Sequence, residues 1–351
     1  MSESKLKELP NATSDIRISI AMATYNGGRF IAEQLASLGK QTLLPLELVV
    51  NDDGSTDKTI ELIEEFARTA PFPVKIFRNE QRLGYADNFL HAASRCAGDL
   101  IAFCDQDDLW MSSKLEICSR EFQDPDVLLC VHSGELFGHG VAAGAKCPGY
   151  DKRRVFNPLT IYPLLSSYGF AMLIRKTLLT ITNNGSRVPS NAWEAHLAHD
   201  KWMWFLASVF GKIVLLPEVL VLYRQHDSNL FGGETGSAGA GISKLGIKRN
   251  YELQAIKEEC AGKILKNISL DLADHWQAKA MAGATLLASC GIANHRRSLL
   301  YADHRTFVQR LGDFLTLVKE GGYITRRRAT RIGLPAALKD MLAGLFRISR
   351  W

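Results

Sequence analysis

Three carboxylates, Asp105, Asp107 and Asp108, stand within four residues directly after the apolar run 100–104. Carboxylates this close repel one another unless they share a cation, and hard oxygen ligands at this spacing suit Mg²⁺ or Mn²⁺, commonly bridging to substrate phosphates. An acidic turn that caps the next segment is the other interpretation, since a D-x-D pattern alone is weak. The sequence argues against an EF-hand, because a calcium loop starting at Asp105 needs glycine where Trp110 stands.

The elements that must position this cluster form a repeating pattern. Four polar loops each follow an apolar run, and a helical pattern follows each of the first three: residues 24–28, 52–55, 78–85 and 105–108. This alternation predicts βαβ crossovers and an α/β fold with a mostly parallel sheet covered on both faces. Ligands of such sheets lie at the carboxyl ends of the strands, where all four loops fall.

The first strand, at about 16–23, is not followed by G-x-G-x-x-G, and G-x-x-x-x-G-K-[ST] occurs nowhere in the chain. Neither a dinucleotide fingerprint nor a P-loop is therefore present. Any phosphates would have to be held by a metal.

The composition sets outer limits on the class of protein. The 351 residues predict two unequal parts, and 46% hydrophobic residues suffice for a sizeable core. No apolar run of transmembrane length occurs, and the start of the chain has no apolar signal segment. Seven cysteines without C-x-x-C spacing suit a reducing compartment, so we expect a cytoplasmic protein.

The positive charge is concentrated in the last third of the chain. Residues 1–243 hold 23 Lys+Arg and 28 Asp+Glu, whereas residues 244–351 hold 19 and 9. This asymmetry argues against a general nucleic-acid binder and indicates a local anionic partner for the tail. Arg326–Arg328 and Arg331 precede an amphipathic stretch at 334–346. It either lies peripherally on an anionic membrane, on the inner face of a bacterial plasma membrane, or packs on the main domain.

Four segments follow from these patterns. We expect an N-terminal tail at 1–15, a catalytic domain at 16–230, a glycine-rich linker or mobile loop at 231–247, and a basic helical region at 248–351.

Several short motifs together resemble a known family. They are Ala-Thr-Tyr-Asn at 23–26, Asn-Asp-Asp-Gly-Ser-Thr-Asp at 51–57, Asp-Gln-Asp-Asp-Leu-Trp at 105–110 and His-Asp at 199–200. Their order and spacing, over about 16–226, resemble the inverting glycosyltransferases of family 2. The resemblance implies a GT-A fold that binds a nucleotide-diphosphate sugar. The acidic motif, the His-Asp pair before an aromatic helix, and Tyr-Arg-Gln-His at 223–226 resemble bacterial rhamnosyltransferases of surface polysaccharides.

The resemblance implies a set of donor-binding residues. Thr24, Tyr25 and either Asp52 or Asp53 would hold the nucleoside, although Asp52 to Ser55 also suits a tight turn around Gly54. A weaker segment adds Asn79, Gly84 and Asn88, and helix capping explains Asn88 equally well. The remaining residues of the implied set are Asn26, Gln106 and Arg224.

The resemblance also assigns the chemistry. Asp107 would bind the metal that bridges the two phosphates, Asp105 would contact the donor sugars or share the metal, and Asp108 would cap the loop. His226 is either a further metal or pyrophosphate ligand or a structural histidine. Asp200 resembles the general base, which takes the proton of the attacking hydroxyl.

His199 stands where the family often has glutamate, so its role is open. Trp202, Trp204 and Phe205 either flank a sugar acceptor or pack in the core.

The implied reaction moves a sugar to a glycan or lipid-linked surface-polysaccharide precursor. The resemblance to the rhamnosyltransferases implies that this sugar is rhamnose. Two alternatives remain. A nucleotidyltransferase would carry a basic glycine-rich signature after the first strand, which residues 24–28 lack. A non-catalytic subunit that binds a nucleotide sugar or glycan is the alternative from another class.

Overall fold

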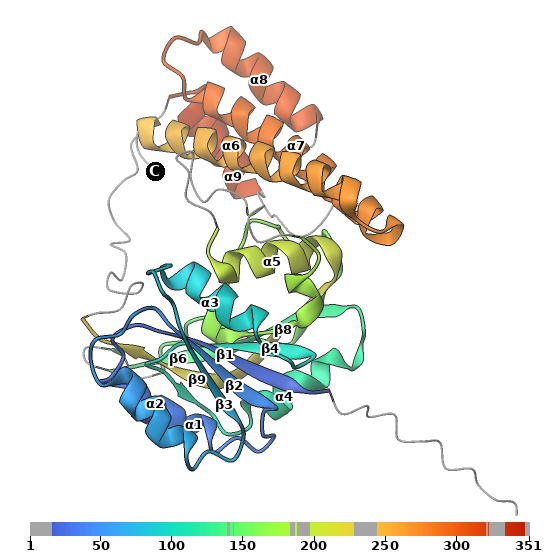
Figure 1. The fold of residues 1–351 in the computed structure, drawn as a ribbon. Coiled ribbons are helices and arrows are strands. Elements are labelled where there is room, and N and C mark those ends of the chain that lie inside the picture. The colour runs from blue at the N-terminus through green and yellow to red at the C-terminus, as the bar shows by residue number, and fades with distance from the viewer. Residues whose placement is uncertain are drawn as a thin grey trace, which may run out of the picture.

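The computed structural model describes residues 16–138, 141–142, 144–182, 187, 197–227, 244–320, 322 and 334–347. A nine-stranded sheet forms the centre of the molecule. In Figure 1, α1 and α2 lie on one face of this sheet, α3 and α5 lie on the other, and the C-terminal helices lie beyond α5. The predicted α/β class with flanking helices is confirmed.

The first half of the sheet has the predicted strand–helix alternation. Its elements are β1 (Ile18–Thr24), α1 (Ile31–Leu38), β2 (Glu47–Asp52), α2 (Thr59–Ala67), β3 (Val74–Arg78), α3 (Tyr85–Ser94) and β4 (Leu100–Cys104). The strands are parallel in the order β3-β2-β1-β4. Every residue of β1, β2 and β4 is buried, as expected for strands covered on both faces.

The second half of the sheet is mixed rather than parallel. It contains β5 (Leu109–Trp110), β6 (Val127–Gly138), β7 (Arg154–Phe156), β8 (Met172–Arg175) and β9 (Lys212–Gln225), with α4 (Lys114–Arg120) and α5 (His199–Phe210) outside it. Strand β8 lies antiparallel between β4 and β6. Parallel neighbours need a long crossover, usually an α-helix, and the described part of the β6–β8 connection holds only β7 and the 3₁₀ turn η2 (Gly169–Ala171).

Strand β9 continues through Pro217, where the sequence predicts a break between two short strands. Its register against β6 shifts beside this proline, so that Leu216 pairs with His132 and Val219 with Ser133. A bulge of this kind accommodates a residue that has no N–H to donate.

The C-terminal region is helical, as expected. It comprises α6 (Lys244–Ile268), α7 (Asp274–Leu300), α8 (Phe307–Lys319), α9 (Leu334–Lys339) and a π-helical turn η6 (Asp340–Leu345). Helix α6 begins inside the range predicted as a linker. The rest of that linker, the tail 1–15 and the arginine cluster at 326–331 lie outside the described residues.

Helices α6 and α7 pack directly on the sheet-containing part of the chain. Leu265 and Leu287 belong to the same buried core as Val209 of α5. Gly283 permits this approach, because a Cβ there would lie 2.8 Å from Leu265 Cδ1 and 3.2 Å from Val209 Cγ1. The Lys279 ammonium also donates to the Phe210 carbonyl oxygen at 2.6 Å.

The last described turn also packs on these helices. The buried Asp340 carboxylate accepts from Tyr301 Oη at 2.7 Å and Tyr251 Oη at 3.2 Å. The contacts of this turn are thus with the C-terminal helices themselves, and not with the main domain on which one interpretation placed the amphipathic stretch. Leu338 and Phe346 on either side of the turn are exposed.

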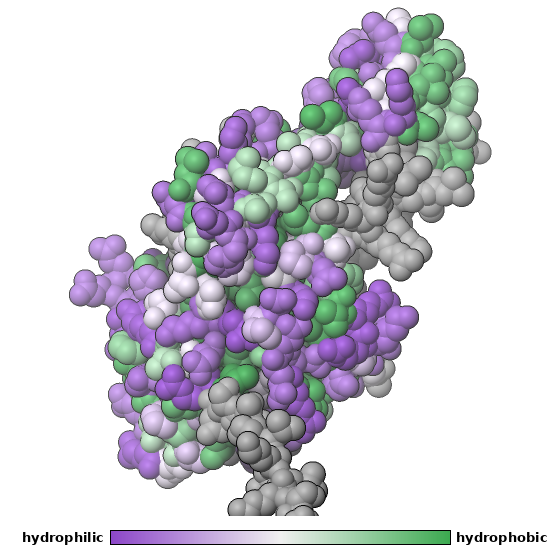
Figure 2. All heavy atoms as spheres, turned by 90° about the vertical axis from the view of Figure 1, so that its right-hand side faces the viewer, coloured by the Kyte–Doolittle hydropathy of each residue, from purple (hydrophilic) through white to green (hydrophobic). Residues whose placement is uncertain are grey.

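The outer surface is mostly polar on the side shown in Figure 2, with hydrophobic atoms gathered over the C-terminal helices at the upper right. Helix α8 exposes Val308, Leu315 and Val318, which recur at helical spacing along one face. None of the described helices is long and apolar enough to cross a membrane.

Candidate active site

The carboxyl ends of β1 to β4 bring the four predicted loops to one edge of the sheet. The loops are tied to one another by side chains rather than by backbone pairing alone. Most of the residues predicted to bind the donor make these ties.

Asp52 holds the loop after β2. Its carboxylate accepts from Thr24 Oγ1 at 2.9 Å, from Ser55 N at 2.8 Å and from Gly54 N at 3.1 Å. Gly54 has φ +86°, which favours glycine. Since Asp52 is fully buried, the tight-turn interpretation describes its contacts.

Asp53 holds the loop after β3 in the same way. Its oxygens accept from Leu83 N at 2.7 Å, from Gly84 N at 2.8 Å and from Asn79 Nδ2 at 3.0 Å. Gly84, with φ +81°, is the N-cap residue of α3. Asn88 therefore does not cap this helix.

Two asparagines complete the loop scaffold. The buried Asn88 accepts from Asn51 Nδ2 at 2.6 Å and donates to the Thr24 carbonyl oxygen at 3.3 Å. Asn26 has φ +47°, and its Oδ1 accepts from Thr56 N at 2.9 Å. Both side chains thus fix loop positions.

Tyr25 is an exposed aromatic side chain at this edge, with 38% of its surface accessible, and Tyr85 after β3 is exposed to a similar extent. The Tyr25 backbone is held by the Gln106 amide, which accepts from Tyr25 N at 3.0 Å and donates to Tyr25 O at 3.1 Å. The Arg82 guanidinium lies 3.9 Å from the centre of the Tyr25 ring. Arg82 is not among the predicted site residues, although its loop is.

The three carboxylates of the acidic cluster have different surroundings. Burial, together with the charges of Asp107 and Asp200, raises the pKa of Asp105 to about 7. Asp108 is fully buried; its Oδ1 accepts from Arg224 N at 3.0 Å, and its Oδ2 has no partner within the described residues. Burial also holds the pKa of Asp108 well above its usual range. Asp108 is therefore part of the loop interior, as expected.

Arg224 and His226 project from the end of β9 towards the acidic loop. The Arg224 guanidinium donates to the Asp107 carbonyl oxygen at 2.8 Å and to Glu33 at 2.7 Å. His226 Nε2 lies 2.9 Å from Asp107 Oδ2. Phe30 packs against both side chains, 4.6 Å from the His226 ring centre and 4.7 Å from the guanidinium carbon.

Among the residues that the structure describes, no three His, Cys, Asp or Glu side chains gather closely enough to hold a metal ion by themselves. Asp107 and His226 nevertheless meet at the acidic loop, with Asp105 close enough for its pKa to respond to the Asp107 charge. Two carboxylates and one imidazole suit a divalent ion that takes its other ligands from substrate phosphates and water.

A buried lysine beneath the cluster escapes sequence analysis. Lys114 Nζ donates to the Phe170 carbonyl oxygen at 2.6 Å and lies 3.4 Å from the centre of the Trp110 ring. Burial lowers its pKa to about 8, while the charges of Asp108 and Asp105 act in the opposite direction. The only sequence signal is its place on the apolar face of α4.

Asp200 is the second residue of α5, where the helix dipole favours a carboxylate. Its Oδ1 accepts from Lys201 N at 2.7 Å. Its charge acts on Asp105 and on Tyr85, whose pKa is raised by burial and by Asp200. Asp200 therefore lies near enough to Asp105 and Tyr85 for its charge to raise their pKa values.

The aromatic residues of α5 form part of the core. Trp202, Trp204 and Phe205 are almost completely buried. Of the two interpretations of this group, core packing describes all three.

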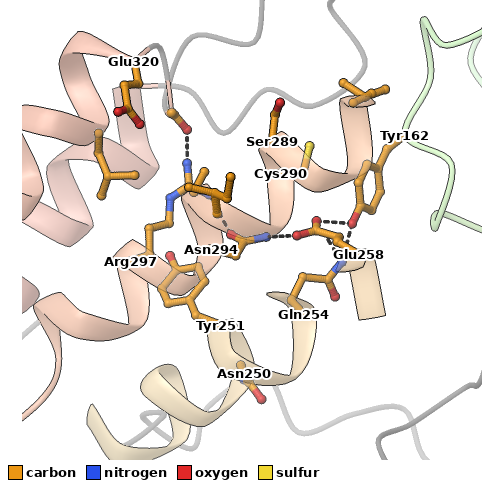
Figure 3. A pocket seen from close by; sticks show the side chains of 15 residues that line it. Tyr162, Asn250, Tyr251, Gln254, Glu258, Ser289, Cys290, Asn294, Arg297 and Glu320 are labelled. Carbon is orange, nitrogen blue, oxygen red and sulfur yellow. Dashed lines mark hydrogen bonds between the residues drawn. The ribbon is translucent and has the colours of Figure 1, made fainter. Parts of the chain in front are cut away.

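A cavity of about 610 Å³ lies away from this edge, between α6, α7 and Tyr162 (Figure 3). At one end the buried Glu258 carboxylate accepts from Tyr162 Oη and, at 2.8 Å, from Asn294 Nδ2. None of the predicted site residues lines it. Its polar end joins the helical region to the sheet-containing region.

Comparisons with known proteins agree with this architecture. Residues 19–176 match the model of the family described as glycosyl transferase family 2. An uncharacterized glycosyltransferase of Nostoc sp. is 36% identical over 232 residues, which cover 61% of this chain and 66% of that protein. The dTDP-rhamnosyl transferase RfbG of Shigella flexneri is 28% identical over 246 residues, which cover 65% of this chain and 79% of RfbG.

A solved structure extends the likeness to most of the chain. The structure of S. aureus TarS 1–349 in complex with UDP-GlcNAc has a TM-score of 0.52 at 18% identity, covering 88% of this chain and 93% of that chain. The predicted GT-A-like fold and the predicted enzyme class are both confirmed. The chain is a glycosyltransferase that uses a nucleotide sugar, and its residues 19–176 form a domain that matches family 2.

Proposed function

We propose that this glycosyltransferase inverts the anomeric centre of its donor and that Asp200 is its general base. The observation that carries the proposal is the electrostatic coupling of Asp200, at the start of α5, to Asp105, at the end of β4. A carboxylate whose charge reaches the proposed donor-side cluster could take the proton of an attacking hydroxyl in a single-displacement transfer, which supports this role for Asp200.

In the proposed step, the acceptor hydroxyl oxygen attacks the anomeric carbon while the bond to the nucleotide diphosphate breaks. Asp200 accepts the hydroxyl proton, and the departing diphosphate takes the bonding electron pair. Tyr25 and Arg82 would lie beside the nucleoside. Asn26, Asn79, Asn88, Asp52 and Asp53 would hold the loops that present those two residues.

Asp107, His226 and Asp105 would hold Mg²⁺ or Mn²⁺, which would stabilise the charge of the leaving diphosphate. Arg224 would keep Asp107 in place through its contact with the Asp107 carbonyl oxygen. A binding measurement tests this assignment without catalysis: Mn²⁺ should raise the melting temperature of the wild type more than that of His226→Ala. An equal rise in both proteins contradicts the role of His226.

The base is tested with Asp200→Asn. The donor is first identified as the UDP-, GDP- or dTDP-sugar that raises the melting temperature in the presence of Mn²⁺. Polyprenyl-diphosphate-linked saccharides then serve as acceptors. We expect Asp200→Asn to bind the donor as the wild type does and to lose about 10²–10⁴-fold in transfer rate.

Glu259→Gln is a matched control, because this carboxylate is exposed and pairs with Lys263 within α6, away from the proposed site. It should keep most of the transfer rate. Unimpaired transfer by Asp200→Asn contradicts the proposal for Asp200.

The substrate class rests on the relatives. RfbG is named as a dTDP-rhamnosyl transferase, which supports a dTDP-rhamnose donor here, whereas the surface-polysaccharide acceptor is supported only by the motif resemblance. The binding-subunit alternative predicts donor binding without donor hydrolysis or transfer in any metal tested.

We further propose that the C-terminal region contacts an anionic membrane. Helix α8 presents Val308, Leu315 and Val318 to the outside, and this third of the chain carries the excess of basic residues. Val308→Asp with Leu315→Asp should weaken co-sedimentation with phosphatidylglycerol vesicles. Leu44→Asp, at an exposed site near the sheet, is the control. Equal sedimentation of all three proteins contradicts this contact.

A further inference from the structure

The side chain next to the proposed base lies in an aromatic enclosure. His199, the first residue of α5, is buried, and its ring stacks on Phe89 of α3 with centroids 4.1 Å apart. The edge of the same ring meets Phe103 of β4 at 4.9 Å. Helix α3 begins at the loop that Asp53 holds, and β4 ends at the acidic cluster. The His199 ring therefore touches both elements that carry the donor-side loops.

Gly169 closes the enclosure from the side of η2. A Cβ at this position would clash with His199 Nε2, and its two next-nearest atoms, Cε1 at 3.3 Å and Cδ2 at 3.4 Å, belong to the same ring. The three nearest atoms all come from His199. A side chain at 169 would therefore press specifically on this ring.

Among the described residues, none makes a polar contact with the ring that would explain a histidine here. Within the described part of the chain, neither Nδ1 nor Nε2 has a hydrogen-bond partner. Burial lowers the pKa of His199 to about 4, so the ring is neutral near pH 7. A charged imidazolium would stabilise the adjacent Asp200 carboxylate and make it a weaker base. A neutral ring does not weaken Asp200 as a proton acceptor in this way.

We propose that His199 is a positioning residue for Asp200: a neutral aromatic wedge, seated between Phe89 and Gly169, that sets where the start of α5 presents the carboxylate. This role rests on the proposed function of Asp200. In this role the shape and packing of the ring matter for the reaction, and its nitrogens do not.

Two variants separate shape from proton chemistry. His199→Phe keeps a flat ring without nitrogens and should retain transfer within about 3-fold of wild type, with an unchanged acidic limb of its pH–rate profile. His199→Ala should lose about 10²-fold in kcat, the cost of a base displaced by about 1 Å, with the KM for the donor little changed. If His199→Phe is as impaired as His199→Ala, or if its acidic limb shifts, the ring nitrogens take part and the proposal is wrong.

A double-mutant cycle tests the contact with Gly169. Gly169→Ala should lower kcat in the wild type, because the added methyl group displaces the ring. The same change should cost little in the His199→Ala background, where the space is free. Gly312→Ala is the control, since nothing lies within 4 Å of a Cβ at that position. Additive effects on kcat contradict the proposal.

Failure of this inference is distinguishable from failure of the base assignment. The cycle is also run on the free energy of unfolding, which reports the Gly169–His199 contact whether or not Asp200 is the base. If Gly169→Ala and His199→Ala are coupled in the free energy of unfolding but Asp200→Asn transfers the sugar at the full rate, the assignment of Asp200 as the base is wrong. If the two variants are coupled in the free energy of unfolding but not in kcat, only the positioning role of His199 is wrong.

Discussion

The residues at the carboxyl edge divide into those that build loops and those that face the ligand space. Asp52 and Asp53 have the residue types expected of nucleoside ligands, yet their oxygens accept from neighbouring backbone N–H groups. A sequence places a carboxylate after a strand, but it does not show which of its lone pairs are already used. That depends on the path of the next loop, which tertiary contacts determine.

His199 gives a residue-scale prediction about pH. Its pKa falls from about 6.5 in the unfolded chain to about 4 in the folded protein, with burial the largest cause, Asp200 raising it and Arg187 lowering it. Between these values the unfolded chain binds a proton that the folded protein does not. Stability should therefore fall as the pH is lowered from 6.5 to 4, by up to about 3 kcal/mol for this group.

The measurement is the free energy of unfolding in urea at pH 7 and pH 5. His199→Phe lacks the titrating ring, so it should lose less stability between these two values than the wild type does. Asp105, whose pKa burial raises to about 7, is present in both proteins, so most of its contribution cancels in the comparison. Identical losses in the two proteins would show that His199 can be protonated in the fold.

At the scale of elements, the predictable part of the sheet is the part with regular crossovers. Strands β1 to β4 are short apolar runs separated by amphipathic helices, and that pattern implies parallel order. Strand β8 carries no such signal, because its neighbours β4 and β6 are chosen by three-dimensional packing. The sequence pattern therefore does not predict the antiparallel pairs of β8 or the continuation of β9 through Pro217.

The junction between the helical and sheet-containing regions gives the element-scale prediction. Tyr162 Oη donates to Glu258 of α6, and the Tyr162 carbonyl oxygen accepts from Trp204 Nε1 of α5 at 3.2 Å. Tyr162→Phe leaves the Glu258 carboxylate buried with one donor fewer. We expect a loss of about 1–3 kcal/mol in the free energy of unfolding.

The control is the same substitution in a Glu258→Gln background. The loss in the free energy of unfolding should be smaller there, because a buried amide that lacks one hydrogen-bond donor costs less than a buried carboxylate that lacks one. Burial already disfavours this charge, since it raises the pKa of Glu258. Denaturant unfolding of the four proteins gives the coupling. Equal penalties in both backgrounds would show that the hydrogen bond contributes nothing specific to the junction.

At the scale of the whole molecule, the basic helical region is less separate than its composition suggests. Charge and glycine content change sharply after residue 230, which predicts a tail, but hydrophobic packing follows a different boundary. Leu265 and Leu287 share one core with α5. Sequence analysis therefore identified the helices, but their docking face depends on close approach at Gly283, which no periodicity reveals.

Removing this region should destabilise the catalytic part. A chain ending at Asp227 exposes Val209 and Phe210, and each large apolar side chain that returns to water costs about 1.5–3 kcal/mol. We expect a melting temperature lowered by more than 10 °C, roughly the effect of losing a few kcal/mol in a domain of this size, together with increased binding of a hydrophobic dye.

A chain ending at Lys319 is the matched control for this truncation. It keeps α6 and α7, with Trp276 against Phe210, and loses α9 and η6, whose Ala337 and Ala343 pack on the second cluster around Leu300 and Tyr301. Its melting temperature should lie between those of the full chain and the shorter one. If the chain ending at Asp227 instead melts like the full protein, the helical region folds as an independent unit. The shared core would then contribute no stability to the catalytic part.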